Sequence, residues 1–183
     1  MRYEANKISL ASIKIFDGND LSKKIKSTVI VDAPVITYKI EAYYYDSSIP
    51  SHYDFDGSRI VKIEKDSTYL ELWFADPGYL WDFSIILHDK SGWIWDENIV
   101  LSPVVEGIPR FGFTNVPPTA KYVTLNVKNI VAYHNLSYIV FMFNSTPYDQ
   151  CNWVNFDRFY FGYNTEQEFV GMAIWSSQEI EQL

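Results

Sequence analysis

The stretch from Tyr69 to Glu97 reads YLELWF (69–74), WDFSIILH (81–88) and WIWDE (93–97), with turn-forming residues between the three pieces. From Trp81 to Leu87 the large apolar residues occupy alternate positions, a period of two that predicts a strand with one buried face. The intervening segments DPG (76–78) and DKSG (89–92) are strong turn signals. The stretch therefore predicts three consecutive antiparallel strands joined by tight turns, that is, a β meander.

Similar short apolar segments recur along the rest of the chain. The expected strands cover residues 12–16, 28–31, 35–45, 60–64, 122–128, 137–143 and 156–163. A short helical turn from Asp20 to Lys26 and loops at 46–58 and 144–152 are expected between them. Residues 99–118 hold four of the eight prolines, which predicts an irregular connection with an extended piece at 110–113. Residues 168–175 alternate as a strand would, although TEQE (165–168) also fits a helix capping box, and the strand is favoured.

About nine or ten short strands separated by turn signals indicate an all-β fold. The expected architecture is an antiparallel β-sandwich, with a jelly roll as the preferred topology. The chain of 183 residues suits one domain spanning 1–183, in which residues 1–30 are a candidate N-terminal extension.

Charge and cysteine content narrow the classes of partner. The net charge of −8 disfavours binding to nucleic acid or to anionic membranes. Cys151 is the only cysteine, so no intrachain disulfide and no cysteine metal cluster are expected. The N-terminus lacks the apolar region of a secretory signal, and no apolar run approaches the roughly 20 residues that span a bilayer. These features predict a protein of the cytoplasm or of a virion, without membrane insertion.

The segment FTNVPPTAKYVTLNV (113–127) contains a proline turn followed by Ala120-Lys121-Tyr122-Val123. It resembles a pattern of jelly-roll modules that occur in phage tail and receptor-binding proteins and in glycan-binding domains. The resemblance covers roughly a third of the chain. The shared residues form a packing motif, so the resemblance implies a fold and a glycan or virion context, and it transfers no functional residue.

Aromatic residues make up 17% of the chain, and they are the first candidates for ligand binding. Tryptophan and tyrosine offer flat apolar rings with one polar group, which suits a sugar ring with an apolar face and a hydroxyl rim. The candidate ligand-binding residues are Trp153, Tyr148, Asp149, Asn152, Trp93 and Trp95. Trp153 is expected in an exposed loop, whereas Trp93 and Trp95 share one face and should be either both buried or both displayed. The competing interpretation is that these rings fill the core, where large apolar residues are mostly found.

A metal site is an alternative hypothesis. His52, Asp54 and His134 have the order of a two-histidine, one-carboxylate iron(II) site, which oxygenases place on a jelly-roll scaffold. The acidic turns DFDG (54–57), Asp76 and Asp89 could supply oxygen ligands to Ca²⁺, but aspartate and glycine are also what turns are made of. No cofactor is therefore expected, with Fe²⁺ and Ca²⁺ as the alternatives.

No catalytic set stands out in the sequence. There is no Gly-x-Ser-x-Gly elbow, the acidic residues select no carboxylate pair, and Cys151 is expected to be a loop or core thiol. The sequence favours a non-catalytic binding or virion-associated module that recognises a glycan or a protein surface. The alternatives are a self-assembling coat or scaffold protein that forms homo-oligomers, and an iron(II) oxygenase.

Overall fold

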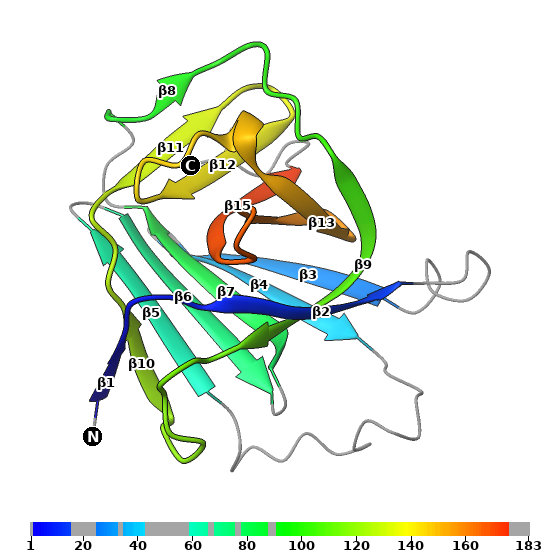
Figure 1. The fold of residues 1–183 in the computed structure, drawn as a ribbon. Helices are drawn as coiled ribbons and strands as arrows, with labels where there is room; N and C mark the ends of the chain where they lie inside the picture. Colours follow the sequence, from blue (N-terminus) through cyan, green and yellow to red (C-terminus); the bar gives the residue numbers. More distant parts are fainter. Residues whose placement is uncertain are drawn as a thin grey trace.

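The protein is a sandwich of two β-sheets that lie one above the other (Figure 1). The computed structural model describes residues 2–15, 25–32, 35–42, 59–65, 68–75, 78–87 and 91–175. Over these ranges the chain forms fifteen strands and the short 3-10 helix η2 (Tyr148–Gln150). None of the described residues belongs to a helix with the length and apolar character needed to cross a membrane.

The first layer is called sheet A. Its strands, in spatial order, are β1 (Arg2–Ala5), β10 (Tyr122–Leu125), β5 (Arg59–Lys65), β6 (Thr68–Ala75), β7 (Tyr79–Leu87), β4 (Val35–Ala42) and β3 (Ile25–Asp32). Strands β5, β6 and β7 form an antiparallel meander, and β4 and β3 continue it. On the other side, β10 pairs in parallel with both β5 and β1.

The second layer is called sheet B. Its strands, in spatial order, are β9 (Val104–Gly112), β13 (Asn152–Phe156), β14 (Phe159–Tyr163), β15 (Phe169–Trp175), β12 (Tyr138–Phe143), β11 (Ile130–His134) and β8 (Ile94–Trp95). The first part of β9 pairs with β13, and its second part pairs with β2 (Ser9–Ile15) and with the start of β7. Strand β9 therefore passes from one sheet to the other and links them (Figure 1).

The expected all-β sandwich is confirmed, with three corrections. The described residues form more strands than the nine or ten expected. The pairing is also mixed, because β1–β10, β10–β5, β9–β13 and β11–β8 are parallel. In addition, β8 does not extend the meander after β7, since it joins β11 in sheet B. Turn residues indicate where a chain reverses, but they do not specify the partner strand; next to β8, Trp93 packs against Phe141 of sheet B.

Two further expectations were wrong. One concerned the proline-containing residues 99–118, and the other concerned the loop and the strand expected over residues 144–163. Residues 104–112 form one long strand, β9, although Pro109 lies inside it. The N–H groups of residues two positions apart point to the same side of a strand. Phe111 N–H donates to Gly78 O, so the nitrogen of Pro109 also faces the side of β7. There β9 is paired with β7 at Arg110, so the missing N–H of Pro109 interrupts no continuous ladder.

Residues 152–163 form two strands, whereas the sequence predicted that a loop ends at residue 152 and that a single strand covers 156–163. Strands β13 and β14 make a hairpin whose turn contains Asp157 at φ 57°. The strand expected at 168–175 is confirmed as β15. The helical turn expected from Asp20 and the loop expected at 46–58 fall wholly or largely outside the described residues.

The main core fills the space between the two sheets. Aromatic rings cross this space in edge-to-face pairs, for example Phe83 of sheet A and Phe159 of sheet B with ring centroids 4.9 Å apart. The largest fully buried side chains here are Phe74, Phe83, Phe141, Phe143, Phe159 and Phe161. The alternation expected for β10 is confirmed, because Val123 and Leu125 are buried in this core while Tyr122 is exposed.

A second, smaller core covers the outer face of sheet B. Val140 and Met142 of β12 point into it, together with Trp153 and the connecting residues Ile99 and Leu101. Strand β12 is therefore buried on both faces, as its nearly continuous apolar sequence predicts.

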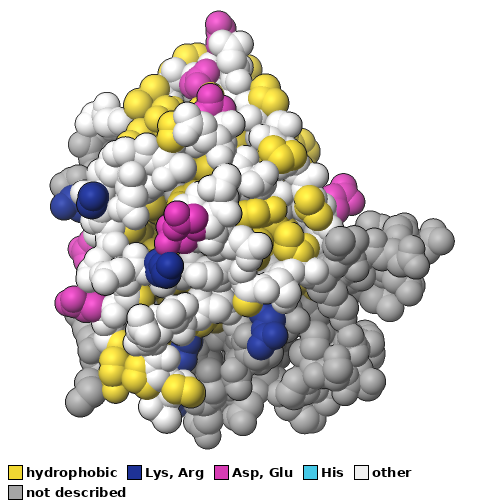
Figure 2. Space-filling view, in the orientation of Figure 1, with side chains coloured by type: hydrophobic (Ala, Val, Ile, Leu, Met, Phe, Trp, Pro, Cys, Tyr) yellow, Lys and Arg dark blue, Asp and Glu magenta, His cyan; other side chains and the backbone are white. Residues whose placement is uncertain are grey.

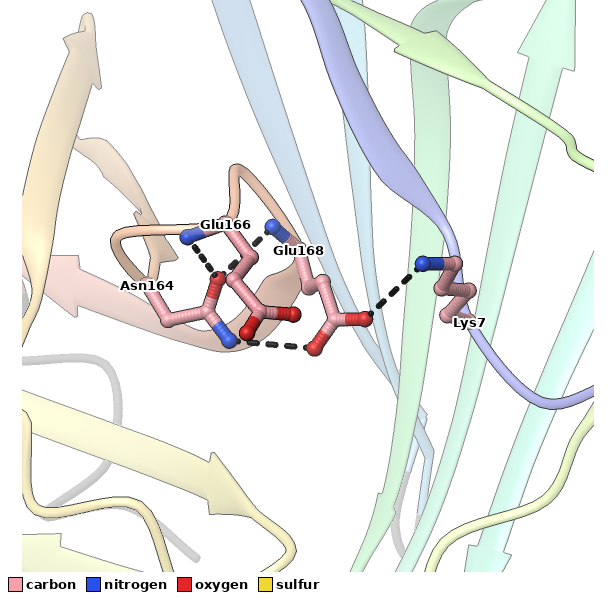
Figure 3. A network of polar contacts seen from close by, with 4 residues as sticks. All are labelled: Lys7, Asn164, Glu166 and Glu168. Carbon is pink, nitrogen blue, oxygen red and sulfur yellow. Dashed lines mark hydrogen bonds and ion pairs between the residues drawn. The ribbon is translucent and has the colours of Figure 1, made fainter.

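A polar network fastens the turn between β14 and β15 to sheet A (Figure 3). Asn164 Oδ1 accepts hydrogen bonds from the N–H groups of Glu166 and Glu168, and Asn164 Nδ2 donates to the Glu168 carboxylate at 3.0 Å. The other oxygen of Glu168 lies 3.2 Å from Lys7 Nζ, in the connection between β1 and β2. The N–H of Leu10 also donates to Gln167 O, so this corner joins the two layers.

Candidate functional site

The outer face of sheet A carries aromatic and polar side chains in two adjacent rows. Strand register places Trp73, Ile60 and Tyr122 in one row across β6, β5 and β10. The same register places Glu71, Lys62 and Thr124 in the next row. A hollow of about 320 Å³ lies over these rows, and its lining comprises Ile60, Lys62, Tyr69, Glu71, Trp73, Tyr122, Val123 and Thr124.

Glu71 is the organising residue of the hollow. One of its carboxylate oxygens accepts a hydrogen bond from Tyr69 OH at 2.5 Å, and the other accepts one from Trp73 Nε1 at 2.8 Å. All three residues share one face of β6, because side chains two positions apart point to the same side of a strand. Hydrogen bonds to a carboxylate are short and strong, so Glu71 holds both aromatic side chains in one position.

Lys62 brings a positive charge to the same region. Its ammonium lies 4.6 Å from the centroid of the Tyr69 ring, within the range of a cation–π contact. It also forms an ion pair of 2.7 Å with Glu64, its neighbour along the outer face of β5. The charge of Lys62 is therefore largely balanced inside the protein.

The described lining of the hollow combines aromatic rings with a few polar groups. Glu71 is the one carboxylate among these described residues, and both of its oxygens accept hydrogen bonds from aromatic neighbours. Lys62, Thr124 and Tyr122 contribute the other polar groups.

The structure corrects the expected position of Trp153. Its side chain has 0% exposure, because residues 152–156 form β13 and the ring lies in the core on the outer face of sheet B. The indole Nε1 donates to Tyr148 O at 3.1 Å. A Cβ on Gly162, its cross-strand partner, would lie 3.0 Å from the ring, so Gly162 makes the space that Trp153 fills.

Of the residues predicted beside Trp153, Tyr148 packs against the core that holds it and accepts its hydrogen bond. Asp149 is exposed, and Asn152 is half-buried in β13. Tyr148 is half-buried and donates its hydroxyl to Asp96 Oδ2 at 2.5 Å. Burial, followed by the hydrogen bond to Asp96, raises the pKa of Tyr148 to about 12. The same bond, together with one from Asn98 N–H, lowers the pKa of the Asp96 carboxyl.

These pKa shifts predict how a Tyr148→Phe substitution changes stability with pH. The pKa of Asp96 is lowered on folding, so its contribution is present above its unfolded pKa and is lost as the pH falls through the lower folded pKa. The pKa of Tyr148 is raised, so its contribution is present below its unfolded pKa and is lost as the pH rises through about 12. Urea unfolding of both proteins should show the variant less stable at pH 7, with the difference shrinking at pH 3. A difference that is independent of pH would contradict this account.

Trp93 and Trp95 lie on either side of His134, with ring-centroid distances of 5.9 and 5.2 Å. Their burial differs, contrary to expectation: Trp93 is half-buried against Phe141, whereas Trp95 is 55% exposed. Among the described strands β8 is the outermost strand of sheet B, and Trp95 lies on it, whereas Trp93 precedes it and packs against Phe141. We call Trp93, Trp95 and His134 the edge cluster.

The metal hypotheses fall mostly outside the described residues. His52 and Asp54 are not described, and neither are the turn residues Asp76 and Asp89, so the proposed iron and calcium ligands cannot be placed together. Within the described ranges, no group of three or more histidine, cysteine or acidic side chains is arranged to hold a metal ion.

Cys151 is buried, as expected for a core thiol. Its Sγ donates to Pro147 O at 3.4 Å. Burial raises the pKa of this thiol to about 11, so it stays protonated and poorly nucleophilic at neutral pH.

No protein-family model matches the sequence, and no curated protein matches it either. The choice of the hollow as a candidate site therefore depends on its geometry alone. Sequence reasoning did not select Tyr69, Glu71 and Trp73, although their alternate spacing opposite Leu70 and Leu72 was a usable signal. The missing information was which face of β6 points outward and which strands lie beside it.

Proposed function

We propose that this protein is a non-catalytic β-sandwich module that binds a glycan in the hollow on the outer face of sheet A. The observation that carries the proposal is the pair of hydrogen bonds by which Glu71 fixes Tyr69 and Trp73. Aromatic side chains locked in position offer a flat apolar surface at little further entropic cost.

The composition of the hollow agrees with the chemistry of a sugar. A pyranose ring presents apolar C–H groups on one side and hydroxyl groups around its rim. The hollow combines Trp73 and Tyr122 with the polar groups of Glu71, Lys62 and Thr124. Its volume of about 320 Å³ lies at the lower end of the range typical of small-molecule sites.

A Trp73→Ala variant should bind glycans at least about tenfold more weakly than the wild type, because a central aromatic contact is removed. A glycan microarray identifies the best ligand, and calorimetry then measures its affinity for both proteins. Trp95→Ala is the matched control, since Trp95 is an exposed tryptophan in the other sheet. If Trp95→Ala abolished binding and Trp73→Ala did not, the edge cluster would be the site and the proposal would be wrong.

A self-assembling structural role is the second candidate. The observation that favours it is the exposure of apolar side chains in and around sheet B, which include Ile94, Trp95, Val100 and Val104. Figure 2 shows several groups of hydrophobic side chains on the surface of this view. Exposed apolar patches often mark contacts between protein molecules. Light scattering of the same samples separates the two roles: an oligomer that Trp95→Ala disperses, without glycan binding, would favour assembly.

A further inference from the structure

The hollow spans three strands, and its two outermost aromatic residues lie in one row. We infer that its ligand is a linear, neutral glycan of at least three pyranose units that lies across β6, β5 and β10, with one ring on Trp73 and another on Tyr122. This inference rests on the proposed function and adds the length, direction and charge class of the ligand.

The distance between Trp73 and Tyr122 indicates the length of the glycan. Trp73 pairs with Ile60, and Ile60 pairs with Tyr122, so the two aromatic residues are two strands apart. Neighbouring strands lie about 4.8 Å apart, which places these residues roughly 10 Å from each other. One sugar ring cannot cover both positions, whereas alternate rings of an extended chain are separated by about this distance. The middle ring would then lie above Ile60.

The second row indicates the direction of the glycan and provides polar contacts along it. Glu71, Lys62 and Thr124 follow one another across the same three strands, parallel to the aromatic row. A chain that crosses the strands therefore keeps polar groups beside each of its three rings. A glycan that ran along β6 would contact Tyr69, Glu71 and Trp73. It would make no contact with Tyr122, which is 53% exposed.

The charges favour a neutral ligand. Among the described residues that line the hollow, Lys62 is the one cation, and it already contacts Glu64 at 2.7 Å. Glu71 contributes a negative charge to the same lining. The carboxylate of a uronic acid over this lining would lie close to the Glu71 charge, and the lysine there is already paired with Glu64.

The test is calorimetry with oligosaccharides of one to six units. The neutral probes are the β-1,4-linked glucose, mannose and xylose series, and the acidic probe is the galacturonic acid series. We expect affinity for one neutral series to rise at least about tenfold between two and four units and then to level off. Tyr122→Ala should remove this gain, whereas Tyr122→Phe should retain it. Thermal unfolding of each variant confirms that it is folded.

The outcomes separate the two proposals. Binding of a monosaccharide as tight as that of a tetrasaccharide, lost on Trp73→Ala, would keep the proposed function and overturn the inference about chain length. Tighter binding of the galacturonic acid series would overturn the inference about charge. The absence of binding to all four series would count against both the inference and the proposed function.

Discussion

A Trp153→Ala variant should lose about 3 to 5 kcal/mol of the free energy of unfolding, the usual cost of removing a large buried aromatic side chain. Trp153 has 0% exposure and packs in the second core beside Val140 and Met142. The substitution would also remove the hydrogen bond from Nε1 to Tyr148 O. A cavity would remain over Gly162, because β14 has no side chain at that position to fill it.

Chemical denaturation monitored by circular dichroism measures this loss, and Trp95→Ala serves as the control. Trp95 is more than half exposed, so its replacement should change stability by less than about 1 kcal/mol. A Trp153→Ala protein with wild-type stability and no glycan binding would contradict the structural role. It would return Trp153 to the ligand-binding residues that the sequence suggested.

The error about Trp153 shows which information the local sequence lacks. Its neighbours Asn152 and Asn155 are common in loops, and this composition predicted exposure. The decisive residue is Gly162, which register places opposite it on the next strand. A tryptophan fits above a glycine on the adjacent strand, but this relation becomes visible only when the strand pairing is known.

The strands themselves were largely predictable, because a period of two is a local property. Alternation located β6, β7, β10 and β15 within a few residues. Partners were less predictable, as β8 shows: the sequence predicts a tight turn between it and β7, yet it pairs with β11 some forty residues later in the chain. A parallel pair of this kind leaves no turn signal in the sequence, so local chemistry could not reveal it.

The two outer faces of the sandwich are used differently. The segment that contains Ile99 and Leu101 covers the outer face of sheet B and gives that sheet a core on each side. The outer face of sheet A instead carries the hollow and its polar and aromatic rows. Among the described residues, sheet B is therefore packed on both faces, whereas the outer face of sheet A carries partly exposed side chains.

Replacing Gly78 with alanine should be the second most damaging change, with a loss of about 2 to 4 kcal/mol in the free energy of unfolding. Gly78 is buried and has φ 111°, a conformation that residues with a side chain rarely adopt. An added Cβ would collide with the carbonyl oxygen of Phe111. The same backbone positions are joined by the hydrogen bond from Phe111 N–H to Gly78 O at 2.8 Å, so the collision would open the contact between β7 and β9.

Gly92→Ala is the matched control, because Gly92 is exposed and an added Cβ would meet no atom within 4 Å. This substitution should leave stability within about 1 kcal/mol of the wild type or raise it slightly, since alanine restricts the unfolded chain. Denaturation curves of the two variants provide the comparison. Because β9 links the two sheets, the Gly78 variant should also show faster amide hydrogen exchange in β9. Equal stability of the two variants would mean that the contact between Gly78 and Phe111 does not hold the sheets together.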